Sequence, residues 1–256
     1  MSKKKNTLLR NTSILMAATI ISRVIGLLYR SPLGETIGNE GLGYYSTASN
    51  LYTILLLISS YSIPMAVSKI VSERLALKEY RNAHRVFHGA LIYAVIVGGI
   101  AALVAFFGGK FLLPYNQQNA LLALRVLAPT IFFSAVLGVL RGYFQAHSTM
   151  MPTSISQIIE QVFNAAFSIG AAWFFIQQFA TNDTEHAKFG AAGGTLGTGA
   201  GVLAGLCFMV IVYGVNRKTI LRKVAKDTRH REESYREIFQ VLFLMVTPVI
   251  FTTFIY

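Results

Sequence analysis

The sequence predicts an all-α integral membrane protein: a six-helix transmembrane bundle followed by the start of a seventh helix. Of its 256 residues, 54% are hydrophobic and only 13% are charged, whereas about a quarter of the residues of a soluble domain are charged. The apolar residues fall in runs of about 20, the length of α-helix that crosses about 30 Å of hydrocarbon. The apolar residues of this chain are therefore expected to be buried in lipid rather than in a soluble core.

Six apolar runs have the length and composition of a complete membrane helix. Three lysines precede the first run, as in a signal peptide, but no cleavage site follows and Arg23 interrupts the run, so we expect a retained span. Pro64 and Pro129 lie within or near the ends of two spans, where they either bend the helix or are passive. The predicted spans cover residues 11–30, 44–68, 86–108, 119–142, 153–179 and 190–215.

A further apolar run begins near residue 238 and continues to Tyr256 without a polar flank. Membrane proteins rarely end inside the bilayer, so we expect residues 237–256 to be an incomplete seventh span. Residues 1–236 would then form an N-terminal transmembrane lobe whose C-terminal partner lobe is missing, either from a fragment or from a truncated gene product. Six spans return the chain to its starting side, which suits two parallel repeats.

The basic residues predict the orientation of the chain. There are 23 Lys and Arg against 11 Asp and Glu, a net charge of +12 that in a soluble protein would suggest nucleic acid. Here most of them lie before the first span and in alternate connections, at residues 69–85, at Arg141 and at residues 217–236. This asymmetry places the N-terminus in the cytoplasm and makes nucleic acid an unexpected partner. Residues 72–85 and 217–236 are either interfacial amphipathic helices on anionic lipid or solvated loops.

The residues that usually carry catalysis or bind metal do not form a recognisable set. The single cysteine, Cys207, lies in an apolar run and has no second cysteine to pair with. The five histidines form no H-E-x-x-H or comparable motif, and no nucleophile, base and oxyanion set can be assembled. We therefore expect no enzyme activity, no cofactor and no metal site.

Two arginines in the first span are the most informative residues. Arg23 lies near the middle of the span, where an arginine costs about 2.5–3.5 kcal/mol on insertion scales. It either lines a water-filled cavity that binds an anion, or it snorkels or pairs internally. Arg30, seven residues later, lies on nearly the same helix face. Because a guanidinium fork suits phosphate oxygens, the pair suggests a pyrophosphate-linked substrate.

The fifth span carries a polar stripe that cannot comfortably face lipid. It either lines the same cavity, where Glu160 would balance an arginine, or forms interhelical hydrogen bonds. The charge of Glu160 favours the cavity, since hydrogen bonding alone would not need it. The stripe consists of Gln157, Glu160, Gln161, Asn164 and Ser168, at helical spacing on one side.

The sixth span carries glycines at every fourth position. Such a ridge of small residues lets helix backbones approach closely. No lysine of the phosphate-binding P-loop type follows it, so we expect helix packing rather than nucleotide binding. The ridge consists of Gly193, Gly197, Gly201 and Gly205.

Several of these motifs together resemble the SpoVB and MurJ type exporters of the multidrug, oligosaccharidyl-lipid and polysaccharide exporter superfamily. The strongest lie before and within the fifth span, and others open the first span and its connection. The matching runs are residues 141–145 (RGYFQ), 151–153 (MPT), 156–161 (SQIIEQ), 22–26 (SRVIG), 29–32 (YRSP) and 41–43 (GLG). Ser31 after Arg30 favours the SpoVB-like branch, and Asn164 stands where many relatives have an arginine.

The resemblance implies a flippase of the bacterial cytoplasmic membrane with two helical lobes around a cationic cavity. Such a protein would move an undecaprenyl-pyrophosphate-linked sugar, such as lipid II or another polysaccharide unit, outward by alternating access. The substrate-binding residues would be Arg23, Arg30, Gln157, Glu160, Gln161 and Asn164. Its partners would be this lipid-linked oligosaccharide, membrane lipids, and the missing C-terminal lobe or a second copy of the chain.

Two other functions remain open from the sequence. A cation-coupled drug exporter of the same superfamily would have the same fold but would need acidic groups in its cavity, and only Glu160 lies within a predicted span. A non-transporting membrane scaffold or fragment would be consistent with the apolar run at Tyr256.

Overall fold

The structure is a computed structural model that describes the backbone of residues 2–227 and 233–255 and the side chains of residues 13–227 and 233–248. Within these residues the secondary structure consists only of helices, which confirms the all-α class. The helices are α1 (Ser2–Leu28), α2 (Arg30–Leu56), α3 (Ile63–Ala76), α4 (Tyr80–Leu112), α5 (Leu121–Ala146), α6 (Met151–Phe179), α7 (Asp183–Ala225) and α8 (Tyr235–Ile255), with a π-helical segment at Leu57–Tyr61 and a 3₁₀ segment at Tyr115–Ala120.

Five helical stretches among the described residues are long and apolar enough to cross a membrane, which makes this a multi-pass membrane protein. The first predicted span corresponds only to a shorter apolar helix, Ser13–Leu28, so the expected count of six is met in part. The five stretches are Arg30–Ala76, Tyr80–Leu112, Tyr115–Ala146, Met151–Phe179 and Asp183–Ala225.

The predicted connection over residues 31–43 is wrong, because α2 already begins at Arg30. Pro32 lies in the first turn of α2, where proline is tolerated since its missing N–H would have no partner there. The backbone departs from the helix only at Gly38, whose φ of 71° and ψ of 174° make a kink that glycine adopts without steric cost. A segment rich in Gly, Pro and Glu is thus a bent helix rather than a loop.

Pro64, whose role the sequence left open, lies where α3 packs against α5. It follows the π-helical segment Leu57–Tyr61, which interrupts the regular helix of the second predicted span. A Cβ atom on Gly142 would lie 2.5 Å from the carbonyl oxygen of Pro64, and one on Gly138 would lie 3.2 Å from its ring. The two glycines therefore make room for the irregular helix start at Pro64.

The glycine ridge packs α7 tightly against α6, as the sequence predicts. A Cβ atom on Gly193 would lie 2.4 Å from the carbonyl oxygen of Ala171, and one on Gly201 would lie 2.4 Å from that of Glu160. These distances are shorter than any real Cβ contact, so only glycine allows this approach. The ridge fixes the backbone of α6 at Glu160.

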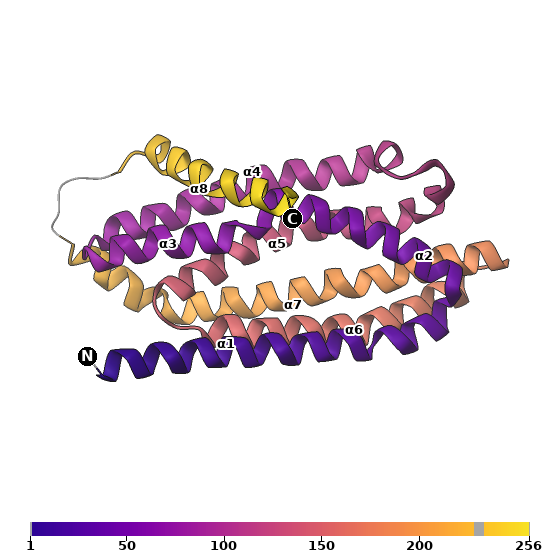
Figure 1. The fold of residues 1–256 in the computed structure, drawn as a ribbon, viewed down its shortest axis with the longest axis horizontal. Coiled ribbons are helices and arrows are strands. Elements are labelled where there is room, and N and C mark those ends of the chain that lie inside the picture. The colour runs from indigo at the N-terminus through magenta and orange to yellow at the C-terminus, as the bar shows by residue number, and fades with distance from the viewer. Residues whose placement is uncertain (1, 228–232, 256) are drawn as a thin grey trace.

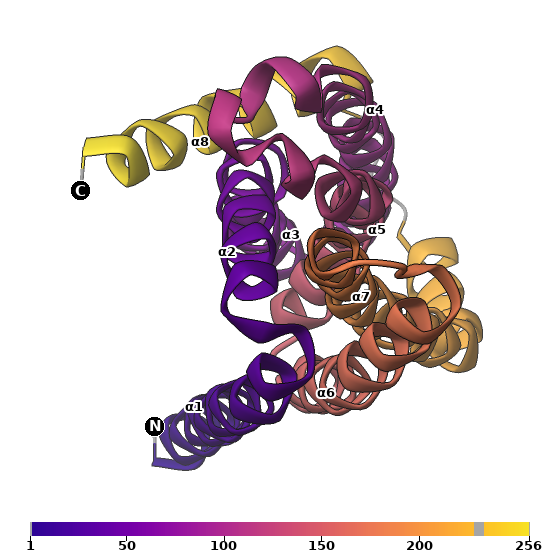
Figure 2. The same ribbon diagram turned by 90° about the vertical axis from the view of Figure 1, so that its right-hand side faces the viewer.

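The helices lie roughly parallel in an elongated bundle, and α1 packs mainly on α6 rather than on α2 (Figures 1 and 2). Seen from the end, α1 and α2 diverge, while α6 and α7 lie side by side and α8 projects away from the bundle (Figure 2). Within the part of the chain that the structure describes, one side of α1 is therefore not covered by a helix, and α1 and α6 form two walls of the site described below.

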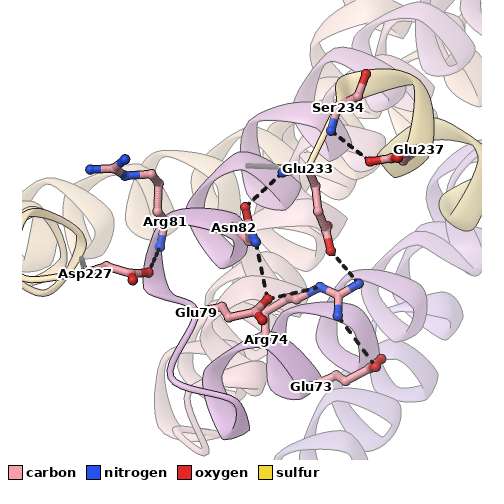
Figure 3. Close-up of polar contacts among 9 residues, drawn as sticks. All are labelled: Glu73, Arg74, Glu79, Arg81, Asn82, Asp227, Glu233, Ser234 and Glu237. Carbon is pink, nitrogen blue, oxygen red and sulfur yellow. Dashed lines mark hydrogen bonds and ion pairs between the residues drawn. The ribbon is translucent and has the colours of Figure 1, made fainter. Parts of the chain in front are cut away.

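The α7–α8 connection is held to the α3–α4 turn by a group of polar contacts that we term the Arg74 clasp (Figure 3). Arg74 Nη2 lies 2.7 Å from Glu233 Oε1, and each of these side chains is 19% exposed. The backbone N–H of Glu233 donates to Asn82 Oδ1 (3.1 Å), and that of Arg81 donates to Asp227 Oδ2 (2.9 Å). Both described ends of the connection are thus tied to the start of α4.

Residues 72–85 are the end of α3, its turn and the start of α4. The described part of residues 217–236 consists of the end of α7 and the start of α8. Among the described residues, neither segment forms a separate interfacial helix. The described parts of both segments are thus the ends of long helices and the turns that join them.

Candidate functional site

A cavity of about 560 Å³ lies between α1 and α6, and α5 contributes one residue to its wall. All six residues predicted to bind substrate line it. The predicted residues in its wall are Arg23, Arg30, Gln157, Glu160, Gln161 and Asn164; Thr19, Ser22, Gly26, Leu27, Tyr29 and Arg141 complete it.

The α1 wall is cationic. Arg23 of α1 and Arg30, the first residue of α2, are exposed and line the cavity. Neither guanidinium has an ion-pair partner among the residues that the structure describes. The internal pairing considered for Arg23 is therefore not observed within the described part of the chain. Two unpaired guanidinium groups in one concave site attract an anion with several oxygens.

The α6 wall carries the acid of the site, and its partner is Arg141 of α5. Arg141 Nη2 donates to Glu160 Oε2 (2.7 Å), and Arg141 Nε donates to Ser156 Oγ (2.9 Å). The two charged side chains are 15% and 21% exposed. The sequence predicts an arginine beside Glu160 but places Arg141 in a cytoplasmic connection. The structure shows that α5 continues to Ala146 and brings Arg141 into the cavity wall.

Asn164 lies at the buried end of the cavity and is held by hydrogen bonds within the protein. Its Nδ2 donates to Tyr29 Oη (3.4 Å), and its Oδ1 accepts from Ser168 Oγ (2.9 Å). Ser168 Oγ also lies 2.8 Å from the carbonyl oxygen of Gly194, so its hydroxyl links α6 to α7. The polar stripe thus divides along α6: the part near Glu160 lines the cavity, and the part near Ser168 bonds to other helices.

Two buried polar atoms in the cavity wall have no hydrogen-bond partner within the described residues, namely Gln157 Oε1 and Ser22 Oγ. Buried polar groups usually have a partner, so both are candidates to bond to water or ligand. Gln161 lies next to α1, because a Cβ atom on Gly26 would be 3.6 Å from its Oε1. Gly26 therefore allows α1 and α6 to lie close together beside the cavity.

A second pocket of about 470 Å³ shares Arg30 with this cavity and extends the polar surface onto α2. Tyr45 and Leu33 contribute buried surface to it. Its remaining polar wall consists of Ser46, Ser49 and Asn50. An anion at Arg30 would thus lie between a charged pocket and one lined by neutral hydrogen-bonding groups.

The residues of both pockets are suited to binding rather than to covalent chemistry. The main cavity combines three guanidinium groups with one carboxylate. No group of three or more His, Cys, Asp or Glu among the described residues is placed to hold a metal ion. What the arrangement can do is bind a multiply charged anion together with an attached polar group.

A family described as polysaccharide biosynthesis proteins matches residues 8–255. Two proteins of Bacillus subtilis are similar: "Lipid II flippase MurJ" is 26% identical over 95% of this chain and 46% of its own length, and "Stage V sporulation protein B" is 28% identical over 93% and 45%. This chain spans about half the length of these curated relatives.

A crystal structure of a MATE protein in its straight conformation has the same fold, with a TM-score of 0.71 at 16% identity over 98% of this chain and 53% of its own. The resemblance of the sequence motifs to SpoVB and MurJ type exporters is thus confirmed by the family match and by both relatives. The chain belongs to the family of polysaccharide biosynthesis proteins.

Proposed function

We propose that this chain is the N-terminal half of a flippase that moves a diphosphate-linked lipid glycan across the bacterial cytoplasmic membrane by alternating access. The observation that carries the proposal is the pair of unpaired arginines, Arg23 and Arg30, in a cavity walled by α1 and the polar face of α6. In this proposal both guanidinium groups bind the diphosphate, since planar guanidinium forks match phosphate oxygens.

The glycan or peptide of the substrate would contact the uncharged polar groups beside these arginines. Gln157 and Gln161 offer amide groups, and the buried Oε1 of Gln157 has no partner within the described residues. The pocket at Tyr45 adds neutral groups on the other side of Arg30. The relatives support the substrate class, because one is described as a flippase of lipid II and the family is described by polysaccharide biosynthesis.

The transport cycle would need a second wall for the cavity. One side of α1 is not covered by another helix of the described chain (Figure 2). We propose that this wall is a C-terminal lobe, with a second copy of this chain as the alternative. The N-terminus would lie in the cytoplasm, because the basic residues cluster in alternate connections.

A drug exporter for small cations is the alternative function, and the charge of the cavity argues against it. Three arginines and one glutamate line the cavity, and the glutamate is already paired with Arg141. A bound cation would therefore meet a net positive wall.

A rescue assay tests the proposal. The complete protein is expressed in bacteria depleted of their own lipid II flippase, as wild type and as Arg23→Ala or Arg30→Ala. We expect wild type to restore growth and each alanine variant to fail at equal membrane abundance. Arg125→Ala is the matched control, because Arg125 is an exposed arginine of α5 that lies outside the cavity and over the ring of Phe106.

Rescue that survives both cavity substitutions would contradict the arginine mechanism. Failure of wild type itself would point to a different lipid-linked glycan or to a chain that does not transport. Loss of rescue in the Arg125→Ala control would mean that the effect of removing an arginine is not specific to the cavity.

A further inference from the structure

We propose that Arg141 is a third anion-binding residue of the cavity, and that the Glu160 carboxylate occupies its guanidinium until substrate binds. In this scheme a phosphate oxygen replaces the Glu160 carboxylate at the Arg141 guanidinium, and the carboxylate takes its place again when the substrate leaves. The inference rests on the proposed function, since it assumes a phosphate-bearing substrate in this cavity.

Arg141 is placed to act on the same ligand as Arg23 and Arg30. It comes from the last turns of α5, yet its side chain lines the same 560 Å³ cavity as theirs. Its Nε and Nη2 donate to Ser156 and Glu160, and within the described residues its Nη1 donates to no protein group. A guanidinium has five N–H donors, so Arg141 retains donors for a ligand even in its resting position.

The contact between Arg141 and Glu160 is of a kind that a phosphate can displace. It joins one carboxylate oxygen, Oε2, to one guanidinium nitrogen, and both side chains are partly exposed. The pair therefore lacks the second parallel hydrogen bond of a bidentate arginine–carboxylate contact. A diphosphate carries more charge than a carboxylate and can accept two parallel bonds from an arginine.

The surroundings hold both residues in place while the contact changes. Ser156 is fully buried and fixes Arg141 Nε, and its own hydroxyl donates to the carbonyl oxygen of Thr153 (2.8 Å). The backbone of Glu160 is held by α7, because Gly201 packs directly against its carbonyl oxygen. Only the Glu160 side chain needs to turn for Arg141 to become free.

This exchange would limit the affinity of the cavity for the diphosphate as well as contribute to it. A cavity with three free arginines would hold a diphosphate tightly and release it slowly. Glu160 lowers the net charge of the empty cavity and competes for Arg141, so it would favour release. The rival explanation is a purely structural ion pair that links α5 to α6.

A charge-neutral double substitution separates the two explanations. The full-length protein is reconstituted in lipid nanodiscs, and binding of undecaprenyl diphosphate is compared with binding of undecaprenol. Arg141→Gln combined with Glu160→Gln leaves the net charge of the cavity unchanged. If Arg141 binds the substrate, the double variant is expected to bind the diphosphate about tenfold more weakly than wild type, with undecaprenol binding unchanged. Equal diphosphate affinity for the double variant and wild type would overturn the proposal.

Single substitutions keep the proposal testable if the double variant does not fold. Glu160→Gln is expected to bind the diphosphate about tenfold more tightly, since it removes a nearby negative charge and frees Arg141. Arg141→Lys keeps the positive charge beside Glu160 but removes the planar guanidinium that can form two parallel bonds. This variant is therefore expected to bind the diphosphate severalfold more weakly. Unchanged affinity in both variants would contradict the scheme. Glu35→Gln, at an exposed carboxylate outside the cavity, is the matched control and is expected to bind like wild type.

The same experiment distinguishes this inference from the proposed function. If wild type binds undecaprenol as well as the diphosphate, or if Arg23→Ala has no effect, the proposed function fails. If those two comparisons succeed and the double variant binds like wild type, only the role of Arg141 fails.

Discussion

Two guanidinium groups, one on α1 and one at the start of α2, define the chemistry of the cavity, because they are exposed, seven residues apart and unpaired among the described residues. Arg23 and Arg30 would be costly in a helix that faced only lipid. Their position is explained if a hydrated anion site lies between α1 and α6. On the opposite wall the Glu160 carboxylate is paired with Arg141. Among the described residues, the charges of the cavity that remain unpaired are therefore the two positive ones.

Replacing Arg23 by lysine tests whether geometry matters in addition to charge. Lysine keeps the positive charge but cannot form two parallel bonds to a phosphate. We expect Arg23→Lys to reduce flippase activity by about tenfold, while Arg125→Lys leaves it unchanged. Initial transport rates at equal protein abundance measure this. Full activity of Arg23→Lys would mean that the site needs only a point charge.

At the scale of elements, the packing of α7 against α6 determines the position of the α6 wall of the cavity. The glycine ridge of α7 lies directly on the α6 backbone, and Gly201 touches the residue that carries the cavity acid. The same helix pair therefore provides stability and positions Glu160.

Gly201→Ala is expected to force α6 and α7 apart, because its Cβ would lie 2.4 Å from the carbonyl oxygen of Glu160. Overpacking of this kind costs roughly 1–3 kcal/mol of folding stability. Thermal unfolding of the purified protein in detergent is the measurement. Gly214→Ala, in the same helix but with no heavy atom within 4 Å of its Cβ, is the control and is expected to be neutral or slightly stabilising. Equal unfolding temperatures for the two variants would show that the helices do not pack this closely.

The Arg74 clasp is a second contact between elements that can be tested (Figure 3). Glu233→Gln removes the charge that Arg74 contacts at 2.7 Å and is expected to weaken the attachment of α8 to the α3–α4 turn by about 1 kcal/mol. Hydrogen exchange is expected to become faster in the first turn of α8, at residues 235–238. Glu35→Gln is expected to leave it unchanged, and unaltered exchange in Glu233→Gln would show that α8 is held by its apolar contacts instead.

Helical periodicity predicted some elements closely and missed others for identifiable reasons. The span over residues 153–179 coincides with α6 (Met151–Phe179), because its apolar and polar faces are well separated. The helix at residues 31–43 was missed because Gly38 and Pro32 usually mark a turn, yet here they are accommodated by a kink and by a first helical turn. Arg141 was missed because a charge at the end of an apolar run suggests a loop, and its acid partner lies on another helix.

At the scale of the whole molecule, the structure has the fold of about half of a solved MATE structure. It covers 53% of the matching MATE structure and about half of its curated relatives. One side of α1 is not covered by another helix of the described chain (Figure 2), and in our proposal a partner lobe provides the second wall of the cavity.

The 256-residue chain expressed by itself is therefore expected to insert into membranes but not to transport. Co-expression of a separate polypeptide that supplies the proposed C-terminal lobe is expected to restore transport. Transport by the chain alone, together with a dimer in size-exclusion chromatography, would show that a second copy provides the other wall.

The most direct test of the account is transport itself, measured with the complete protein in liposomes that contain a fluorescent undecaprenyl-diphosphate-linked sugar. A membrane-impermeant quencher reports how much of the lipid has crossed the bilayer. The account predicts rapid crossing with wild type and with Arg125→Ala, and crossing at the protein-free rate with Arg23→Ala and Arg30→Ala. Crossing at the wild-type rate in both cavity variants, or no crossing with any version of the protein, would contradict it.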